Sequence, residues 1–345
     1  MEIDDHGGWP GVLGRLSAGE DIGAEAAHAV LATVLRGEAT DAQLAAFLVA
    51  LRQKGESVDE LCGLVQAMRE AAVPLKVPPG TIDLVGAGGS RLGREAALNV
   101  STMASFVAAG AGATVCKHGN RRASSTSGSF DVLEALGVHI DADAALVETS
   151  VREVGVGFAF ARTFHPAMRF AGPVRAQLGI ATVFNILGPL AHPGRLTRQV
   201  VGVPDAVVGE RMAAVLAATG SERALVVTGD GGLDELSTTG PNVVHRVDDG
   251  SIDTITVDPT DLGFAPATAD QLRGGDADAN ARIARAVFAG EHGPHRDIVV
   301  LNAAAGLLTA GVAADLADGV AAAAGAIDSG AAADRLDRLV ELTNR

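Results

Sequence analysis

The fold class of this 345-residue chain follows from Thr81-Ile82-Asp83-Leu84-Val85-Gly86-Ala87-Gly88-Gly89-Ser90. Its first half predicts a short buried strand, and its glycines predict a tight turn before a helix at 101–111. Glycines let backbone amides converge closely on an anion. The turn is not a P-loop, because no Gly-Lys-Ser/Thr follows, and Arg91 breaks the dinucleotide fingerprint. A plain strand–helix connection is the alternative interpretation.

Strands and helices alternate on the C-terminal side of this stretch. The pattern predicts further strands at 114–117, 199–203, 224–228 and 298–302, and helices at 131–136, 207–219, 279–288 and 315–329. Such alternation is typical of an α/β fold with a mostly parallel central sheet and helical covers.

The N-terminal side has a different character, because apolar residues recur there at helical spacing. Helices are predicted at 25–36, 41–54 and 57–72. Thr40 and Ser57 stand where helix N-caps belong, and Gly37 and Gly55 stand where helices end. The Val-Pro-Pro-Gly run at 77–80 then predicts a boundary between a small all-helical domain and a larger α/β domain.

Composition excludes several classes of function. The net charge is −15 and no basic run is present, so no nucleic-acid partner is expected. Cys62 and Cys116 form neither a CxxC motif nor a metal cluster, which favours a reducing compartment. The acidic start is no secretion signal and the apolar runs are too short to span a bilayer, so we expect a cytoplasmic protein without membrane contact.

A polar loop occupies residues 117–129, with the sequence Lys-His-Gly-Asn-Arg-Arg-Ala-Ser-Ser-Thr-Ser-Gly-Ser. It gathers three cations, one Asn and five hydroxyls between a predicted strand end and a helix start. In open parallel sheets, ligands bind at this edge. The density of donors favours an oxyanion cradle over a solvated loop.

Three further groups offer weaker signals. Ser101 and Thr102 begin a predicted helix, where they could cap it or help to hold a phosphate and a Mg²⁺ ion. Asp234 and Glu235 are adjacent in a loop, where they could grip Mg²⁺ or form an ordinary acidic surface pair. Arg175 could bind a carboxylate through two parallel hydrogen bonds or lie on a helix surface.

In their order along the chain, these motifs resemble the anthranilate phosphoribosyltransferase family, over roughly residues 10 to 335. The KHGNR and LGPL blocks are the most specific. The blocks that carry the resemblance are GAGGS (86–90), NVST (99–102), KHGNR through LEALG (117–137), FHPA (164–167), RAQLG (175–179), FNILGPL (184–190), GDGGLDE (229–235), GGDADAN (274–280) and VVLNAA (299–304).

The resemblance implies transfer of a phosphoribosyl group from phosphoribosyl pyrophosphate to anthranilate in tryptophan biosynthesis, with Mg²⁺. It also implies a homodimer and a site between a helical domain (1–78 plus about 165–190) and an α/β domain (79–164 and 191–345). The implied roles are as follows: donor binding by Gly86, Gly88, Gly89, Asn99, Ser101, Thr102, Lys117 and Ser129; metal binding by Ser101, Asp234 and Glu235; acceptor binding by His118, Asn120 and Arg175; catalysis by Asp234, Glu235 and Lys117.

One segment departs from the family pattern. The family's GTGGD reads GAGGS here, and residues 91–98 form a longer connection that adds Arg91, Arg94 and Glu95. A relative with a changed donor or acceptor is therefore an alternative. A nucleoside phosphorylase of the same broad fold is disfavoured, since it needs no metal pair for pyrophosphate. A binding homologue without catalysis is the third alternative.

Overall fold

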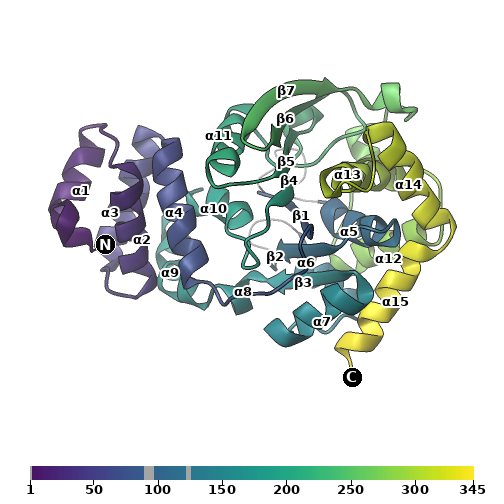
Figure 1. Cartoon of the computed structure of the whole chain (residues 1–345), viewed down its shortest axis with the longest axis horizontal. Coiled ribbons are helices and arrows are strands. Elements are labelled where there is room, and N and C mark those ends of the chain that lie inside the picture. Colours follow the sequence, from purple (N-terminus) through teal and green to yellow (C-terminus); the bar gives the residue numbers. More distant parts are fainter. Residues whose placement is uncertain (1, 89–96, 122–125) are drawn as a thin grey trace.

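A seven-stranded sheet organises the larger part of the molecule (Figure 1). The computed structural model describes residues 2–88, 97–121 and 126–345. The strand order is β3-β2-β1-β4-β5-β6-β7, with β1 to β5 parallel and the last two pairings antiparallel. The strands are β1 (Ile82–Gly86), β2 (Val115–Gly119), β3 (Val156–Phe160), β4 (Arg198–Gly202), β5 (Arg223–Thr228), β6 (Asn242–Asp248) and β7 (Ser251–Val257). The predicted α/β class with a mostly parallel sheet is confirmed.

The helices form an N-terminal bundle and two layers over the sheet (Figure 1). The bundle comprises α1 (Gly8–Ser17), α2 (Gly23–Leu35), α3 (Asp41–Lys54) and α4 (Val58–Ala71). Short helices α8 (Ala161–Phe164), α9 (Gly172–Leu178) and α10 (Phe184–Leu190) return the chain to it. The others are α5 (Val100–Gly110), α6 (Ser129–Ala135), α7 (Ala144–Val154), α11 (Ala206–Ala218), α12 (Ala277–Phe288), α13 (Pro294–Ala310), α14 (Leu316–Asp328) and α15 (Ala331–Thr343). No helix among the described residues is long and apolar enough to cross a membrane.

Successive strand residues point to opposite faces of the sheet, and each face has its own core. Leu225 in β5 joins the core beneath α5 and α13, whereas its neighbour Val226 joins a core that reaches α11 and the N-terminal bundle. The bundle therefore shares its apolar interior with one face of the sheet. Near-continuous burial along β1 to β5 is expected for parallel strands covered on both sides.

The predicted helix starts in the bundle are confirmed. Thr40 accepts a hydrogen bond from the amide of Gln43, and Ser57 accepts one from the amide of Glu60, both at 3.3 Å. Each is completed as a capping box by the side chain three residues later. Gly55, with φ of 87°, caps the end of α3.

The strand predicted at 298–302 is wrong, because this run lies inside the 17-residue helix α13. Pro294 occupies the first turn, where its missing amide costs nothing, and apolar residues continue to Ala310. The helix is buried on most sides, so no amphipathic period distinguishes it from a buried strand. The β6–β7 hairpin was not predicted, although its Asp249-Gly250 turn has the positive φ values typical of a tight hairpin.

Candidate active site

The order of strands reverses between β1 and β4, and a ligand site is expected at such a switch point in an open sheet. Gly86 and Gly202 pair there at the ends of the two strands. A Cβ atom on Gly202 would lie 1.7 Å from the carbonyl oxygen of Asp234, and one on Gly86 would lie 2.7 Å from Asp234 Oδ2. The acidic loop therefore sits directly over the switch point, and only glycines leave room for it.

The two predicted carboxylates are gripped by backbone amides from different segments. The amide of Gly88 donates to Asp234 Oδ2 at 2.8 Å, and the amide of Ser101 donates to Glu235 Oε1 at 3.2 Å. Ser101 lies in the first turn of α5, where amides lack partners within the helix. The glycine-rich turn, the start of α5 and the acidic pair, which are far apart in the sequence, thus meet at one point.

Lys117 lies close to this acidic pair and is itself buried, with 3% of its surface exposed. Its Nζ atom donates to the carbonyl oxygen of Leu84 at 2.6 Å. Burial lowers the pKa of Lys117, while the charges of Asp83, Glu235 and Asp234 oppose that shift. Burial also raises the pKa of Asp83, to about 7. The site therefore gathers several ionisable groups that are shielded from water.

Desolvation raises the pKa of Asp234, and it raises that of Glu235 well above the usual range with help from the Asp234 charge. Two crowded carboxylates that resist ionisation fit a divalent cation, because its charge would stabilise both anions. Among the described residues, no group of three or more His, Cys, Asp or Glu side chains is arranged so that it could hold a metal ion by itself. The carboxylate pair of Asp234 and Glu235 is a donor set that Mg²⁺ favours, since Mg²⁺ takes one or two carboxylates and completes its coordination shell with water and substrate phosphate.

The 117–129 loop and α5 are tied together by Asn280, which is fully buried. Its Nδ2 atom donates to Asn99 Oδ1 at 2.8 Å and to Ser127 Oγ at 3.1 Å. Its Oδ1 atom accepts from the amide of Gly275 at 2.8 Å. Asn280 thus fixes Asn99, a predicted donor contact, to the polar loop. Its role was not predicted, although it closes the GGDADAN motif.

A second amide, that of Asn302, holds the acidic loop from below. Asn302 Oδ1 accepts from the amide of Leu236 at 2.9 Å, and Nδ2 donates to the carbonyl of Leu236 at 2.8 Å. A further bond from Nδ2 to the carbonyl of Ile298 anchors this side chain to α13. The backbone N–H and C=O of Leu236 are therefore both hydrogen-bonded, as they would be beside a neighbouring strand. This role was also not predicted, because the segment was interpreted as a strand.

The loop residues of the donor side lie at the end of β2. Ser129 Oγ donates to the carbonyl oxygen of Asn120 at 3.1 Å, and a Cβ atom on Gly119 would lie 2.3 Å from Ser129 Oγ. Thr102 is buried in α5, and its hydroxyl has no partner among the described residues. Gly89, Arg91, Arg94 and Glu95 fall outside the described residues, as do 122–125 of the polar loop.

Three imidazoles gather beside β2. The ring centroid of His118 lies 5.1 Å from that of His165 and 5.7 Å from that of His192. His118 Nδ1 contacts the carbonyl of Gly188 at 3.2 Å, and among the described residues its Nε2 has no partner. Burial lowers the pKa of His118 well below its usual range, that of His165 to about 4 and that of His192 to about 3. All three rings are therefore neutral at pH 7.

Arg175 lies on α9, and its guanidinium stands 5.0 Å over the ring of Phe184. Burial lowers its pKa. No described contact joins Arg175 to His118 or Asn120, so the structure brings together the predicted donor and metal residues more closely than the predicted acceptor residues.

Sequence comparison assigns the two parts of the chain to one family. Residues 10–72 match the model of the glycosyl transferase family helical bundle domain, and residues 78–333 match that of the glycosyl transferase family a/b domain. The chain is 48% identical over 316 residues to the anthranilate phosphoribosyltransferase of Arthrobacter sp. strain FB24, covering 91% of this chain and 89% of that protein. It is 47% identical to the one from Methylobacterium nodulans, with coverage of 96% and 98%.

Solved structures agree. The crystal structure of anthranilate phosphoribosyltransferase from Thermus thermophilus superimposes with a TM-score of 0.91 at 41% identity, covering 97% of this chain and 99% of that one. The Saccharomyces cerevisiae enzyme in complex with PRPP and Mg gives a TM-score of 0.88 at 25% identity, with coverage of 97% and 98%. The chain belongs to the anthranilate phosphoribosyltransferase family of glycosyl transferases.

Proposed function

We propose that this protein transfers the 5-phosphoribosyl group of phosphoribosyl pyrophosphate to the amine of anthranilate, with release of pyrophosphate, in tryptophan biosynthesis. The observation that carries the proposal is the placement of Asp234 and Glu235 over the β1–β4 switch point, within hydrogen-bond reach of the Gly88 and Ser101 amides. The names of the relatives support the same reaction.

The donor side would bind a diphosphate through opposite kinds of groups. Asp234 and Glu235, with the hydroxyl of Ser101, would hold Mg²⁺, while the amides of the glycine-rich turn and the first turn of α5 would face phosphate oxygens. Bound Mg²⁺ supplies charge that makes pyrophosphate a good leaving group. The buried ammonium of Lys117 lies beside the acidic pair and would stabilise negative charge as the sugar–oxygen bond breaks.

The acceptor side needs little acid–base chemistry. An aromatic amine is neutral at pH 7 and can attack the sugar carbon without losing a proton first. The neutral rings of His118 and His165 would orient such an acceptor through Nε2 atoms that have no partner among the described residues. They would add no positive charge near the electron-poor sugar carbon. Arg175 would bind the acceptor carboxylate. Rate acceleration would come mainly from positioning and electrostatic stabilisation.

A second candidate is a related transferase with another aminobenzoate as acceptor. Ala87 favours it, since Ala87 replaces the threonine of the family's GTGGD turn and removes a hydroxyl next to the switch point. The backbone of the turn is retained, as the amide of Ala87 still donates to the carbonyl of Gly202 at 2.8 Å.

A product assay by mass spectrometry separates these candidates. The protein is mixed with Mg²⁺, phosphoribosyl pyrophosphate and one member of an aminobenzoate panel at a time. We expect the phosphoribosyl adduct of anthranilate to form fastest, together with loss of anthranilate fluorescence. Faster turnover of another aminobenzoate would favour the second candidate. If no member of the panel gave an adduct, the protein would be a binding homologue without catalysis.

We also propose the domain division and the assembly stated from the sequence. Packing of α9 on α3 and of α10 on α4 supports grouping residues 165–190 with residues 1–78 as the helical domain, leaving 79–164 and 191–345 as the α/β domain. Exposed Val49, Phe170 and Ile180 in the helical part support a homodimer formed there. Light scattering at increasing protein concentration tests it, and a constant monomer mass would exclude it.

A further inference from the structure

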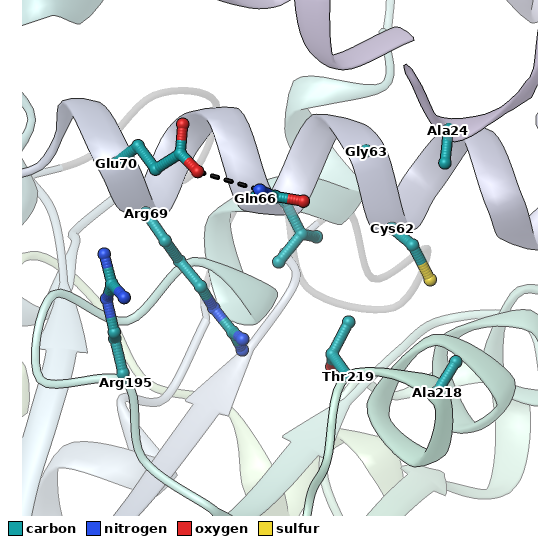
Figure 2. Close-up of a pocket in the computed structure, with 10 residues that line it drawn as sticks. Ala24, Cys62, Gly63, Gln66, Arg69, Glu70, Arg195, Ala218 and Thr219 are labelled. Carbon is teal, nitrogen blue, oxygen red and sulfur yellow. Dashed lines mark hydrogen bonds between the residues drawn. The ribbon is translucent and has the colours of Figure 1, made fainter.

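A pocket of about 420 Å³ lies away from the switch point, between α4, the end of α11 and the turn at residues 192–195 (Figure 2). Two cations line one end of it and run past each other in opposite directions. Arg69 points from α4 toward the turn, and Arg195 points from the turn toward α4. Cys62 and Ala218 lie toward the other end of the pocket, and Val65 adds to its apolar lining. This size is within the range of sites for small organic ligands.

The one carboxylate that lines the pocket, that of Glu70, already has hydrogen-bond partners. Glu70 Oε1 accepts from Gln66 Nε2 at 2.8 Å, and Glu70 Oε2 contacts His28 Nε2 at 2.8 Å. Two guanidinium groups and one carboxylate leave a net charge of +1 among the lining residues, in a chain whose net charge is −15. The pocket is therefore a local positive site on an acidic protein.

The two guanidinium groups differ in what they can still bind. Arg69 uses Nε and Nη2 for the carbonyl oxygen of Leu190, at 3.2 and 2.9 Å. Burial and the nearby charge of Arg195 lower its pKa. No described residue accepts a hydrogen bond from the exposed guanidinium of Arg195. The five N–H donors of Arg195 therefore remain available to an anion, and the net charge of +1 among the lining residues matches one carboxylate better than a doubly charged phosphate.

The turn that presents Arg195 is held in an uncommon conformation. Arg195 has a φ of 48°, in the left-handed region that costs a residue with a Cβ atom roughly 1–2 kcal/mol. His192 fixes the turn, because its Nδ1 accepts from the Gly194 amide and its Nε2 donates to the Cys116 carbonyl, both at 2.9 Å. Strained residues kept in place by their surroundings often serve a site.

From this arrangement we infer that the pocket is a binding site for a small organic monocarboxylate with an apolar body, separate from the substrate site. The carboxylate lies between Arg69 and Arg195, and the body lies against Val65 and Ala218. Binding joins α4 of the bundle to the turn that precedes β4, so it stabilises the contact between the helical part and the sheet.

Cys62 provides a readout that does not depend on activity. It lines the pocket and is partly exposed, whereas Cys116 is fully buried, so alkylation by iodoacetamide reports on Cys62 alone. Benzoate is the probe, and benzamide is its uncharged match. We expect benzoate to slow the alkylation rate, as followed by intact mass, and benzamide to have no effect. Cys62→Ser, which should remain unlabelled, verifies the site of reaction.

Two arginine variants separate this pocket from the acceptor site, which also would bind benzoate. In Arg195→Ala the benzoate concentration for half-protection should rise about tenfold, while Arg195→Lys should restore part of the protection. In Arg175→Ala the protection should persist. Loss of protection in Arg175→Ala with retention in Arg195→Ala would overturn the proposal, as would equal protection by benzamide or stronger protection by inorganic phosphate.

Discussion

At the β1–β4 end of the candidate site, Asp234, Glu235 and Lys117 concentrate charge, whereas the α8–α10 end places the neutral rings of His118 and His165 side by side. The charged end resists ionisation until a cation arrives, because desolvation raises the pKa of both carboxylates. At the neutral end, a hydrogen bond from a ring nitrogen to a backbone carbonyl, such as that of His118 to Gly188, fixes the orientation of the ring. The first end therefore suits the charged donor and metal of the proposed reaction, and the second suits its uncharged amine acceptor.

The largest effect should follow from removing charge at the first end. The double substitution Asp234→Asn with Glu235→Gln should lower turnover by about 10³-fold or more, because metal stabilisation is worth several kcal/mol. Side-chain shape is kept, so thermal unfolding in the absence of Mg²⁺ should change little. Full activity of the double variant would rule out these carboxylates as the metal site.

The next effect tests whether the acidic pair depends on its support. Asn302→Asp keeps the acceptor for the Leu236 amide but loses the donations to the carbonyls of Leu236 and Ile298. We expect about a hundredfold loss of kcat/KM and a weaker calorimetric affinity for Mg²⁺ with phosphoribosyl pyrophosphate, since small displacements of a catalytic group are costly.

The control for this variant is Asn344→Asp, an exposed asparagine that caps the end of α15 by bonding to the carbonyls of Gly137 and Val340. It should retain activity and donor affinity. If Asn302→Asp lost stability but kept donor affinity and the Mg²⁺ requirement of the wild type, Asn302 would be a structural residue without influence on the acidic pair.

The comparison also shows where sequence reasoning works. The bundle helices were predicted closely, because caps such as Thr40 are local signals that need no distant partner. The acidic pair and the start of α5 were singled out from their chemistry, and the structure brings them together, while their roles stay predictions. Asn280 and Asn302 were missed, since their side chains matter only through residues far away in the sequence. The error at 298–302 also comes from tertiary packing, because a helix buried on most sides loses the amphipathic period that would identify it.

Arg175→Ala tests the second end through its only predicted cation. Loss of one bidentate pair should raise the acceptor KM about thirtyfold, equivalent to about 2 kcal/mol, and leave donor affinity unchanged. Arg169→Ala is a matched control, because Arg169 also stands over an aromatic ring, 4.5 Å from the centroid of Phe170. A rise in donor KM instead of acceptor KM would show that the acceptor site is misplaced.

The smallest effect concerns the neutrality of the imidazoles. The pKa of His192 is about 3 in the fold and about 6.5 in an unfolded chain, so the folded state binds fewer protons between these values. Its contribution to stability is present above pH 6.5 and is lost as the pH falls. Moving from pH 7.5 to 5.5 should cost about 1.4 kcal/mol through this residue alone. The cause of the low pKa is burial of the ring, and a proton on Nδ1 would also face the Gly194 amide.

Urea unfolding at pH 7.5 and 5.5 gives the change in the free energy of unfolding for the wild type and for His192→Gln. Comparing the two changes cancels any loss of packing that is the same at both pH values. The variant should lose about 1.4 kcal/mol less than the wild type on acidification. His139→Gln, at an exposed position, should behave as the wild type does. If His192→Gln were as acid-sensitive as the wild type, the neutral state of this end would rest on His118 and His165, and the turn that carries Arg195 would not be pH-sensitive.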